Sequence, residues 1–306
     1  MTDPSPKRTG SERLARLPAP PGDPLDPSLV QRAYEDLDNY RIESGRIGSN
    51  TCAVYFSGHG LYYPNTRAVF TKQILDKDRY EWFKTRVPGA GRHIFVRDVH
   101  KQWYVEGING RCRSHEELRR LLAAETAGQD LVTVGSSAGG YAAALFGCLL
   151  NASHVLCFSG QFSLGLILGD DAARSQNDLL ARAWGDGEKG RYLELRELVA
   201  GGDTPVFYFF PAYNPEDVDQ YRQLAGTKNL YPFCMKSTRM GCHCTRVPCR
   251  TCLGSDARRC RPYGPGPLRD PEAVSACPCG SAARLRPSHR TSPPSSISKS
   301  AGSRPV

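Results

Sequence analysis

Short apolar runs alternate with amphipathic segments along most of this chain. The apolar runs lie at 51–58, 92–98, 130–136, 154–160, 204–212 and 229–235, and helical patterns cover 114–128, 138–151, 172–200 and 215–226. Strands that are apolar throughout and separated by helices belong to a sheet that is covered on both faces. The pattern therefore predicts an α/β fold with a mostly parallel sheet and helices on both faces.

The alternation stops at both ends of the chain. Residues 1–28 are rich in Pro, Asp and Arg, which predicts a flexible leader. Residues 241–306 are rich in Cys, Arg and Pro and have no apolar periodicity, which predicts a disordered tail. We therefore expect a single folded domain over 29–240.

The positive charge is concentrated in the tail. The chain has a formal net charge of +9, but residues 240–306 hold 11 Lys and Arg against 3 Asp and Glu, leaving 29 against 28 for residues 1–239. The body is nearly neutral, and the basic run Arg258–Arg261 has no aromatic residues interleaved with it. We therefore expect no nucleic-acid partner. Nothing in the sequence indicates a protein partner.

The apolar runs and the cysteines together indicate the cellular compartment of the protein. The sequence contains no run of about 18 apolar residues, so it predicts no membrane span. The N-terminal segment lacks the apolar core that a secretory signal needs. The body cysteines sit mostly in apolar runs, as buried thiols do. We expect a cytoplasmic protein with no membrane partner.

The segment Gly135–Gly139 matches the pattern G-x-S-x-G between an apolar strand and a small-residue helix. A nucleophile elbow requires this context, because the tight turn exposes the middle serine at the carboxyl edge of the sheet. Ser137 is the predicted nucleophile, since Ser136 lacks glycine at both two-residue offsets. The backbone N–H of Ala138 is the predicted first oxyanion donor. The alternative is a small-residue turn that only packs helix against strand.

A second oxyanion donor is expected in the loop after an early strand. The run Ser57–Gly60 follows the strand at 51–56, and glycines let a backbone N–H approach a substrate oxygen closely. We predict Gly60 as this donor, with an ordinary glycine turn as the alternative. His59 is not expected to be the general base, because this architecture places that histidine last in chain order.

An acid is expected after a late strand. Glu216, Asp217 and Asp219 follow the strand at 204–212. We favour Asp217, then Asp219, then Glu216. All three also suit the first turn of a helix, where acids stabilise the helix dipole, so a purely structural role is the alternative.

These features resemble the α/β-hydrolase family of serine hydrolases over about residues 50–240. The resemblance rests on "VGSSAGGYAA", the strand order and the late acid. "FSGHGLYYPNT", "KDRYEWF" and "RDVHKQWYVEGIN" are similar to a bacterial subgroup associated with surface-polysaccharide loci. The resemblance implies a Ser–His–Asp triad, an acyl-enzyme intermediate and ester or amide hydrolysis without a cofactor.

The chain departs from this family at the general base. The family pattern expects a His-Gly pair after the last strand, where this chain has Met240-Gly241. If the Arg239 codon ends in C, reading one nucleotide earlier converts this pair to His-Gly and continues into an apolar, foldable pattern. We interpret the change at Met240 as a shift of reading frame. The nucleotide sequence around codon 239 tests this directly.

A zinc site is the rival interpretation of the tail. It would draw on the thiols and imidazole of Cys242, His243, Cys244, Cys249, Cys252 and Cys260. Only one C-x-x-C pair is present, whereas structural zinc sites usually combine two ligand pairs with a few core residues. We therefore expect no metal.

Together these observations predict a serine esterase or deacylase that acts through an acyl-enzyme on a small-molecule or glycan ester. Ser137 and Asp217 are its catalytic residues, and Ala138 and Gly60 form its oxyanion hole. We expect activity to be impaired, because Met240 replaces the histidine. Two alternatives stay open: a catalytically inactive hydrolase-like binding module, and an acyltransferase in surface-polysaccharide biosynthesis.

Overall fold

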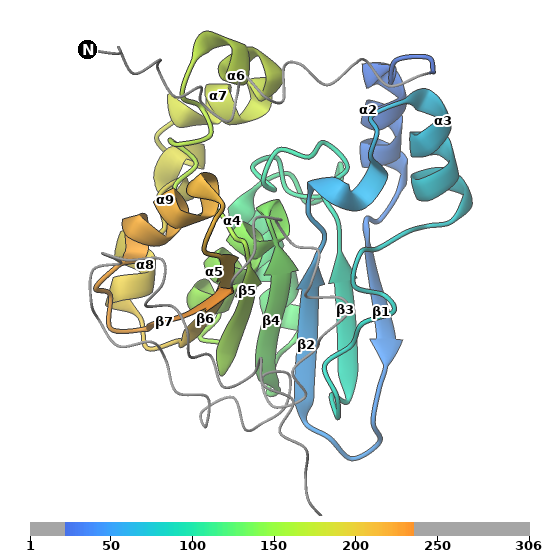
Figure 1. Ribbon diagram of the computed structural model, residues 1–306. Helices are drawn as coiled ribbons and strands as arrows, with labels where there is room; N and C mark the ends of the chain where they lie inside the picture. The colour runs from blue at the N-terminus through green and yellow to red at the C-terminus, as the bar shows by residue number, and fades with distance from the viewer. Residues whose placement is uncertain (1–21, 236–306) are drawn as a thin grey trace, which may run out of the picture.

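The computed structural model describes residues 22–235 of the 306-residue chain (Figure 1). The predicted leader up to residue 21, Met240 and the predicted tail lie outside the described residues. The interpretations placed on them stay predictions. None of the helices between residues 22 and 235 has the length and apolar character needed to cross a bilayer.

A seven-stranded sheet forms the centre of the described residues, in the order β1-β3-β2-β4-β5-β6-β7. Only β1 is antiparallel to its neighbour. The strands are β1 (Tyr40–Ser44), β2 (Thr51–Phe56), β3 (Arg92–Val96), β4 (Asp130–Ser136), β5 (His154–Phe158), β6 (Val206–Pro211) and β7 (Leu230–Met235). The predicted α/β class and mostly parallel sheet are confirmed.

Helices follow most of the strands. They are α2 (Pro27–Asp36), η1 (His59–Tyr62), α3 (Arg67–Phe70) continuing into η2 (Thr71–Asp76), α4 (His115–Glu125), α5 (Ala138–Leu149), α6 (Asp171–Gln176), α7 (Asp178–Trp184), η3 (Lys189–Tyr192), α8 (Arg196–Gly201) and α9 (Pro215–Leu224). Local sequence explains their starts. Ser114 caps α4 by accepting a hydrogen bond from the Glu117 N–H.

The core lies on both faces of the sheet. On one face, α5 packs against β2, β4 and β5 with residues that are buried from Ala138 to Cys148, because small side chains let the helix approach the strands closely. On the other face, Tyr80, Trp82 and Val87 of the segment between η2 and β3 pack against β2 and β3.

Strand β1 and helix α2 were not among the predicted elements. β1 is an edge strand whose residues are mostly exposed or half-buried, so it carries no apolar run that a sequence pattern can reveal. Helix α2 begins at Pro27 with Asp26 as its N-cap, within residues that were predicted as leader.

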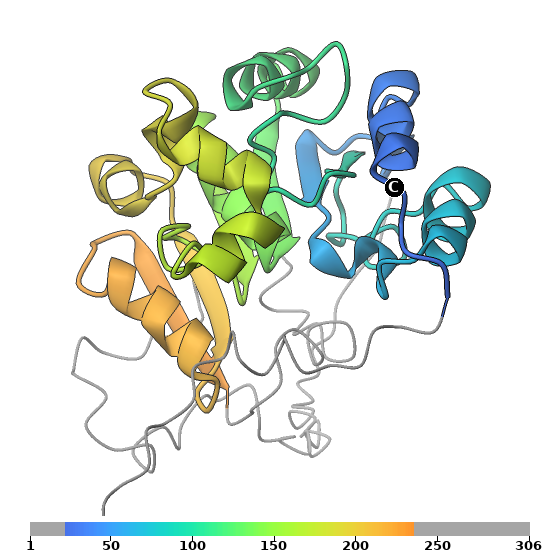
Figure 2. The same ribbon diagram turned by 90° about the horizontal axis from the view of Figure 1, so that it is seen from above.

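The carboxyl ends of β2 to β7 lie at one edge of the sheet. Figure 1 shows α2 and α3 beyond this edge on one side, and α6 and α7 beyond it on the other. Figure 2 looks down on the same edge. Segments between strand and helix therefore meet at this edge, where α/β proteins place their sites.

Candidate functional site

Ser137 occupies a sharp turn between β4, which ends at Ser136, and α5, which begins at Ala138. Its backbone has φ 53° and ψ −124°, a conformation that residues other than glycine rarely adopt. Its N–H donates to the Phe158 carbonyl at 3.0 Å. Its hydroxyl makes no hydrogen bond within residues 22–235. The turn therefore holds a strained serine whose side chain is not used by the surrounding structure.

The two flanking glycines are required by close backbone contacts. A Cβ on Gly135 would lie 1.9 Å from the Gly139 carbonyl oxygen, and one on Gly139 would lie 2.2 Å from the Phe56 carbonyl oxygen. Real side chains do not approach backbone so closely, so neither position tolerates alanine without a shift of the main chain. The spacing G-x-S-x-G is thus explained by sterics on both sides of Ser137.

The loop after β2 lies directly against this turn. A Cβ on Gly58 would lie 2.6 Å from the Ser136 carbonyl oxygen and 3.6 Å from the Gly139 nitrogen. Ala138 begins α5, so its N–H has no acceptor within the helix, and neither it nor the Gly60 N–H has a partner in the described part of the chain. The structure thus brings the glycine loop to the serine turn and leaves both predicted oxyanion donors unengaged.

The three candidate acids differ in their surroundings. Asp217 is buried, with 4% of its surface exposed, in the first turn of α9 after β6. Glu216 and Asp219 are exposed, and Asp219 forms an ion pair with Arg222 at 2.7 Å. Asn214 caps α9 through the Glu216 N–H, so Asp217 is not the residue that caps this helix.

One oxygen of Asp217 is unusual. Its Oδ2 is buried and has no hydrogen-bond partner in residues 22–235. Burial raises the pKa of the Asp217 carboxyl to about 7, and the nearby Ser159 hydroxyl opposes part of that rise. A buried carboxylate oxygen without a partner carries a free-energy cost, and strongly shifted pKa values are frequent at functional sites.

Strand β5 links the serine to the acid. It lies between β4 and β6, and its last residue, Phe158, accepts the hydrogen bond from the Ser137 N–H. The next residue, Ser159, donates its N–H to the Phe209 carbonyl at 2.7 Å, while its side chain lies beside Asp217. The ends of three adjacent strands therefore carry Ser137, Ser159 and the loop leading to Asp217.

No histidine of the described residues serves as the partner of Asp217 Oδ2. His59 lies closest to the glycine loop in sequence, and its ring meets Trp103 edge-on at 4.5 Å. Burial and the nearby Lys101 charge lower the pKa of His59 to about 3, so its ring is neutral at pH 7. A group with so low a pKa is a weak general base, in agreement with the prediction from chain order.

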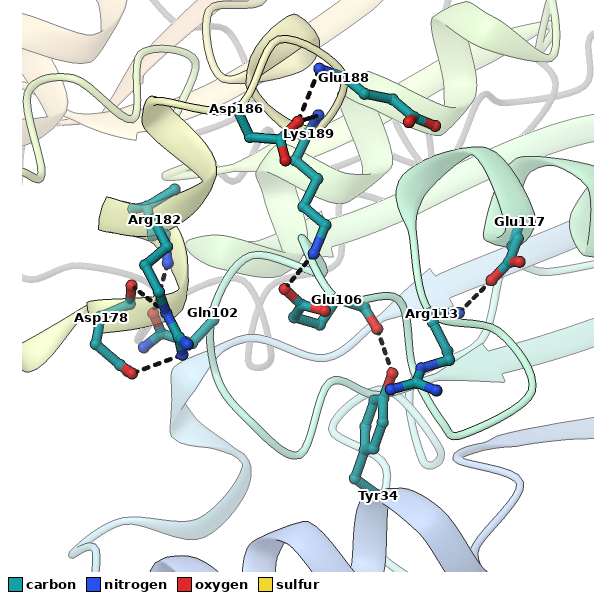
Figure 3. A network of polar contacts seen from close by, with 11 residues as sticks. Tyr34, Gln102, Glu106, Arg113, Glu117, Asp178, Arg182, Asp186, Glu188 and Lys189 are labelled. Atoms are coloured by element: carbon teal, nitrogen blue, oxygen red, sulfur yellow. Dashed lines mark hydrogen bonds and ion pairs between the residues drawn. The ribbon is translucent and has the colours of Figure 1, made fainter.

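The loop after β3 forms a wall beyond the carboxyl edge. Asp98 accepts hydrogen bonds from the N–H groups of His100, Gln102 and Tyr104, which shapes the loop from within. Glu106 anchors it from outside: its carboxylate pairs with Lys189 at 2.7 Å and its carbonyl accepts from the Tyr34 hydroxyl (Figure 3). The loop is thus fixed between α2 and η3.

Two residues at this edge form a contact that the sequence did not predict. Trp103 donates its Nε1–H to Gln161 Oε1 at 2.6 Å, which joins the loop after β3 to the loop after β5. Trp103 lies in the segment "RDVHKQWYVEGIN", but its pairing with Gln161 could not be read from the sequence, because the pair is formed only when two distant loops meet. Metal ligation finds no support here: no cluster of three or more His, Cys, Asp and Glu side chains in residues 22–235 is arranged to hold an ion.

Comparison with known proteins gives matches only among solved structures. No family model matches the chain, and no curated protein matches its sequence. The capsule O-acetyltransferase of Neisseria meningitidis serogroup A is 13% identical, with 66% of this chain and 85% of that chain covered and a TM-score of 0.46. MenH from S. aureus is 11% identical, with 68% and 92% covered and a TM-score of 0.39.

A third solved structure, MGS-M2, an α/β hydrolase from a Medee basin deep-sea metagenome library, is 10% identical over 70% of this chain and 91% of that one, with a TM-score of 0.40. We assign the fold type from this chain's own features, which are the strand order of its sheet and the strand-turn-helix at Ser137. The fold is of the α/β-hydrolase type.

Proposed function

We propose that this protein is a serine hydrolase of the esterase or deacylase type, with Ser137 as nucleophile. The observation that carries the proposal is the backbone strain at Ser137, maintained by contacts at Gly135 and Gly139 that exclude any side chain. Strain of this kind persists where the surrounding structure enforces it and is concentrated at active sites. It supports the interpretation of this turn as a nucleophile elbow.

In the proposed reaction, the Ser137 oxygen attacks the acyl carbon while its proton passes to a base. The carbonyl oxygen gains negative charge, which the N–H groups of Ala138 and Gly60 stabilise, helped by the N-terminus of α5. The alcohol then leaves with a proton, and water releases the acyl group from the serine in a second step. The proposed substrates are esters, and glycan esters are the proposed natural substrates.

Asp217 is the proposed orienting acid. Its burial and its unpaired Oδ2 support this role, since an imidazole N–H directed at that oxygen would satisfy it. The same contact would lower the pKa of the carboxyl from about 7, because a donor near the charged form favours it. An acid kept ionised in this way holds the base in the correct tautomer.

We propose that the base is lost in this chain because Met240 stands in its place, through a shift of reading frame. Loss of one triad member leaves only the catalysis due to the oxyanion hole and binding, about three to four orders of magnitude above the uncatalysed rate. In this proposal the chain with Met240 is therefore impaired, whereas a chain with histidine at position 240 is an active esterase.

Labelling with a fluorophosphonate probe tests these roles. We expect slow labelling of the unsubstituted chain and no labelling of Ser137→Ala. Met240→His should be labelled at least about 100-fold faster than the unsubstituted chain, given the cost of removing a triad member. Asp217→Asn in the Met240→His background should remove most of that gain. Ser136→Ala is the matched control and should label like its parent.

Each alternative has its own result. Labelling that survives Ser137→Ala contradicts the nucleophile, and a Met240→His chain that labels no faster contradicts the position of the base. A protein that never labels but binds glycans is a binding module. Acyl transfer is distinguished by supplying sugar acceptors: product carrying the acyl group on a sugar hydroxyl, in place of free acid, identifies an acyltransferase.

A further inference from the structure

The segment Arg79–Trp82 holds the loop after β2 in place. Five hydrogen bonds join this segment to the loop and to the end of β2. Arg79 donates to the Leu61 carbonyl at 2.8 Å and to the Gly60 carbonyl at 3.4 Å. The Glu81 N–H donates to Ser57 Oγ at 3.3 Å, the Gly58 N–H to Glu81 Oε2 at 2.6 Å, and Trp82 Nε1–H to the Phe56 carbonyl at 3.1 Å. Because the segment and the loop are about 20 residues apart in sequence, these bonds are tertiary contacts that fix the conformation of the loop.

Glu81 is the member of this set that reaches both Gly58 and Gly60. Its Oε2 accepts from the Gly58 N–H, and its Oε1 would lie 2.6 Å from a Cβ on Gly60. Its carboxylate therefore rests against both glycines of the loop. On its other side, Gly58 contacts the turn of Ser137, where a Cβ would lie 2.6 Å from the Ser136 carbonyl oxygen.

We propose that Glu81 is a positioning residue of the candidate active site, which holds the Gly58–Gly60 loop so that the Gly60 N–H is presented to the acyl oxygen on Ser137. This proposal rests on the proposed function. Glu81 occupies the Gly58 N–H, so that group is not available to a substrate, while the Gly60 N–H is left without a partner in the described residues.

Burial and neighbouring groups act on the ionisation of the Glu81 carboxyl in opposite directions. Burial raises the pKa of Glu81, whereas its bond to Gly58 and the positive charges of Arg79 and Lys101 lower it. Burial also lowers the pKa of Lys101 to about 7. Among the described residues, Tyr104, His59, Asp98 and Tyr62 also face this set, Tyr62 through its ring, whose centroid lies 3.6 Å from Lys101 Nζ.

Two substitutions separate the bond from the charge. Glu81→Gln keeps an oxygen that can accept from Gly58, whereas Glu81→Ala removes the acceptor. Glu197→Ala, at an exposed site on α8, is the matched control. In the Met240→His chain we expect Glu81→Ala to lower the rate of Ser137 labelling at least about 10-fold, since a lost hydrogen bond to a charged group changes an equilibrium by that order. Glu81→Gln should stay within about 3-fold of its parent.

A second measurement does not depend on activity. The Leu61 N–H donates to the Gly58 carbonyl, so hydrogen exchange at Leu61 reports opening of the loop without involving Glu81 directly. In the natural chain Glu81→Ala should speed exchange at Leu61 about 10-fold or more, with little change for Glu81→Gln or Glu197→Ala.

The outcomes are distinct. Unchanged exchange at Leu61 in Glu81→Ala overturns the positioning role, whether or not the serine reacts. Faster exchange with unchanged labelling also overturns it, because the loop would then not serve the serine. If Ser137 is unreactive in every variant while exchange rises as expected, the proposed function fails and Glu81 is shown to order the loop alone.

Discussion

The serine side and the acid side of the carboxyl edge are built differently. Around Ser137, backbone atoms of β2, β4 and α5 are in such close contact that two glycines cannot be replaced. Around Asp217, one carboxylate oxygen is buried without a partner, and burial raises the pKa of the carboxyl to about 7. Within residues 22–235 the first region is closely packed, and the second leaves one carboxylate oxygen unpaired.

Within residues 22–235, the surroundings of Ser137 are therefore closely packed backbone, whereas those of Asp217 include an unpaired buried oxygen. The turn of Ser137 is enforced by strands and a helix that are all described, so its geometry does not depend on a base. In the proposed function, Asp217 acts through a donor that reaches Oδ2. Mutations should therefore affect the serine side through packing and the acid side through ionisation.

The largest effect is expected at Gly139. Gly139→Ala would place a Cβ 2.2 Å from the Phe56 carbonyl oxygen, so β2 and α5 must move apart. We expect the free energy of unfolding to fall by about 3 kcal/mol or more, measured by urea denaturation. Gly201→Ala is the matched control, because nothing lies within 4 Å of its Cβ, and it should be neutral or slightly stabilising. Equal effects at both glycines would contradict the packing argument.

A smaller effect, dependent on pH, is expected at Asp217. Its pKa is about 7 when folded and 3.8 as the reference value, so the folded state binds more protons than the unfolded state between these limits. The free energy of unfolding should therefore fall as pH rises from about 4 to 7, by about 1–3 kcal/mol. Asp217→Asn should make this slope shallower by the contribution of Asp217 when urea denaturation is repeated across that range.

Asp219→Asn is the control for this titration. Asp219 is exposed and paired with Arg222 on the surface, so its substitution should leave the slope unchanged. A natural chain whose stability does not fall between pH 4 and 7 would show that Asp217 is already paired.

The smallest effect is expected at Ser159. Its hydroxyl lowers the pKa of Asp217, so Ser159→Ala should raise that pKa by about 0.5–1 unit. This change in pKa can be measured by NMR, from the chemical shift of the Asp217 carboxyl carbon as pH is varied. A shift in the opposite direction would show that Ser159 bonds to the neutral form of the acid.

The fold was largely predictable because its central strands are apolar runs. Strand β4 has the predicted bounds, and β5, β6 and β7 begin within two residues of prediction. Strand β1 was missed, since its pairing with β3 supplies the stability that its own exposed residues do not. Pairing partners of an edge strand leave no periodic trace in its sequence.

The candidate site was predictable only in part. Ser137, Ala138 and Gly60 were named from local motifs, because a strand, a tight turn and a helix leave a sequence signature. The pair of Trp103 and Gln161 and the contact of Glu81 with Gly58 were not foreseen. Each joins segments that are far apart in the chain, so no local spacing encodes it.

The sequence by itself determined the class of the fold and the turn at Ser137, since each is a local pattern. Tertiary structure decided that Asp217 is buried while Glu216 and Asp219 are exposed. It also decided that Glu81 supports the glycine loop. Burial and partners depend on which elements pack together, and that information is distributed over the whole sheet.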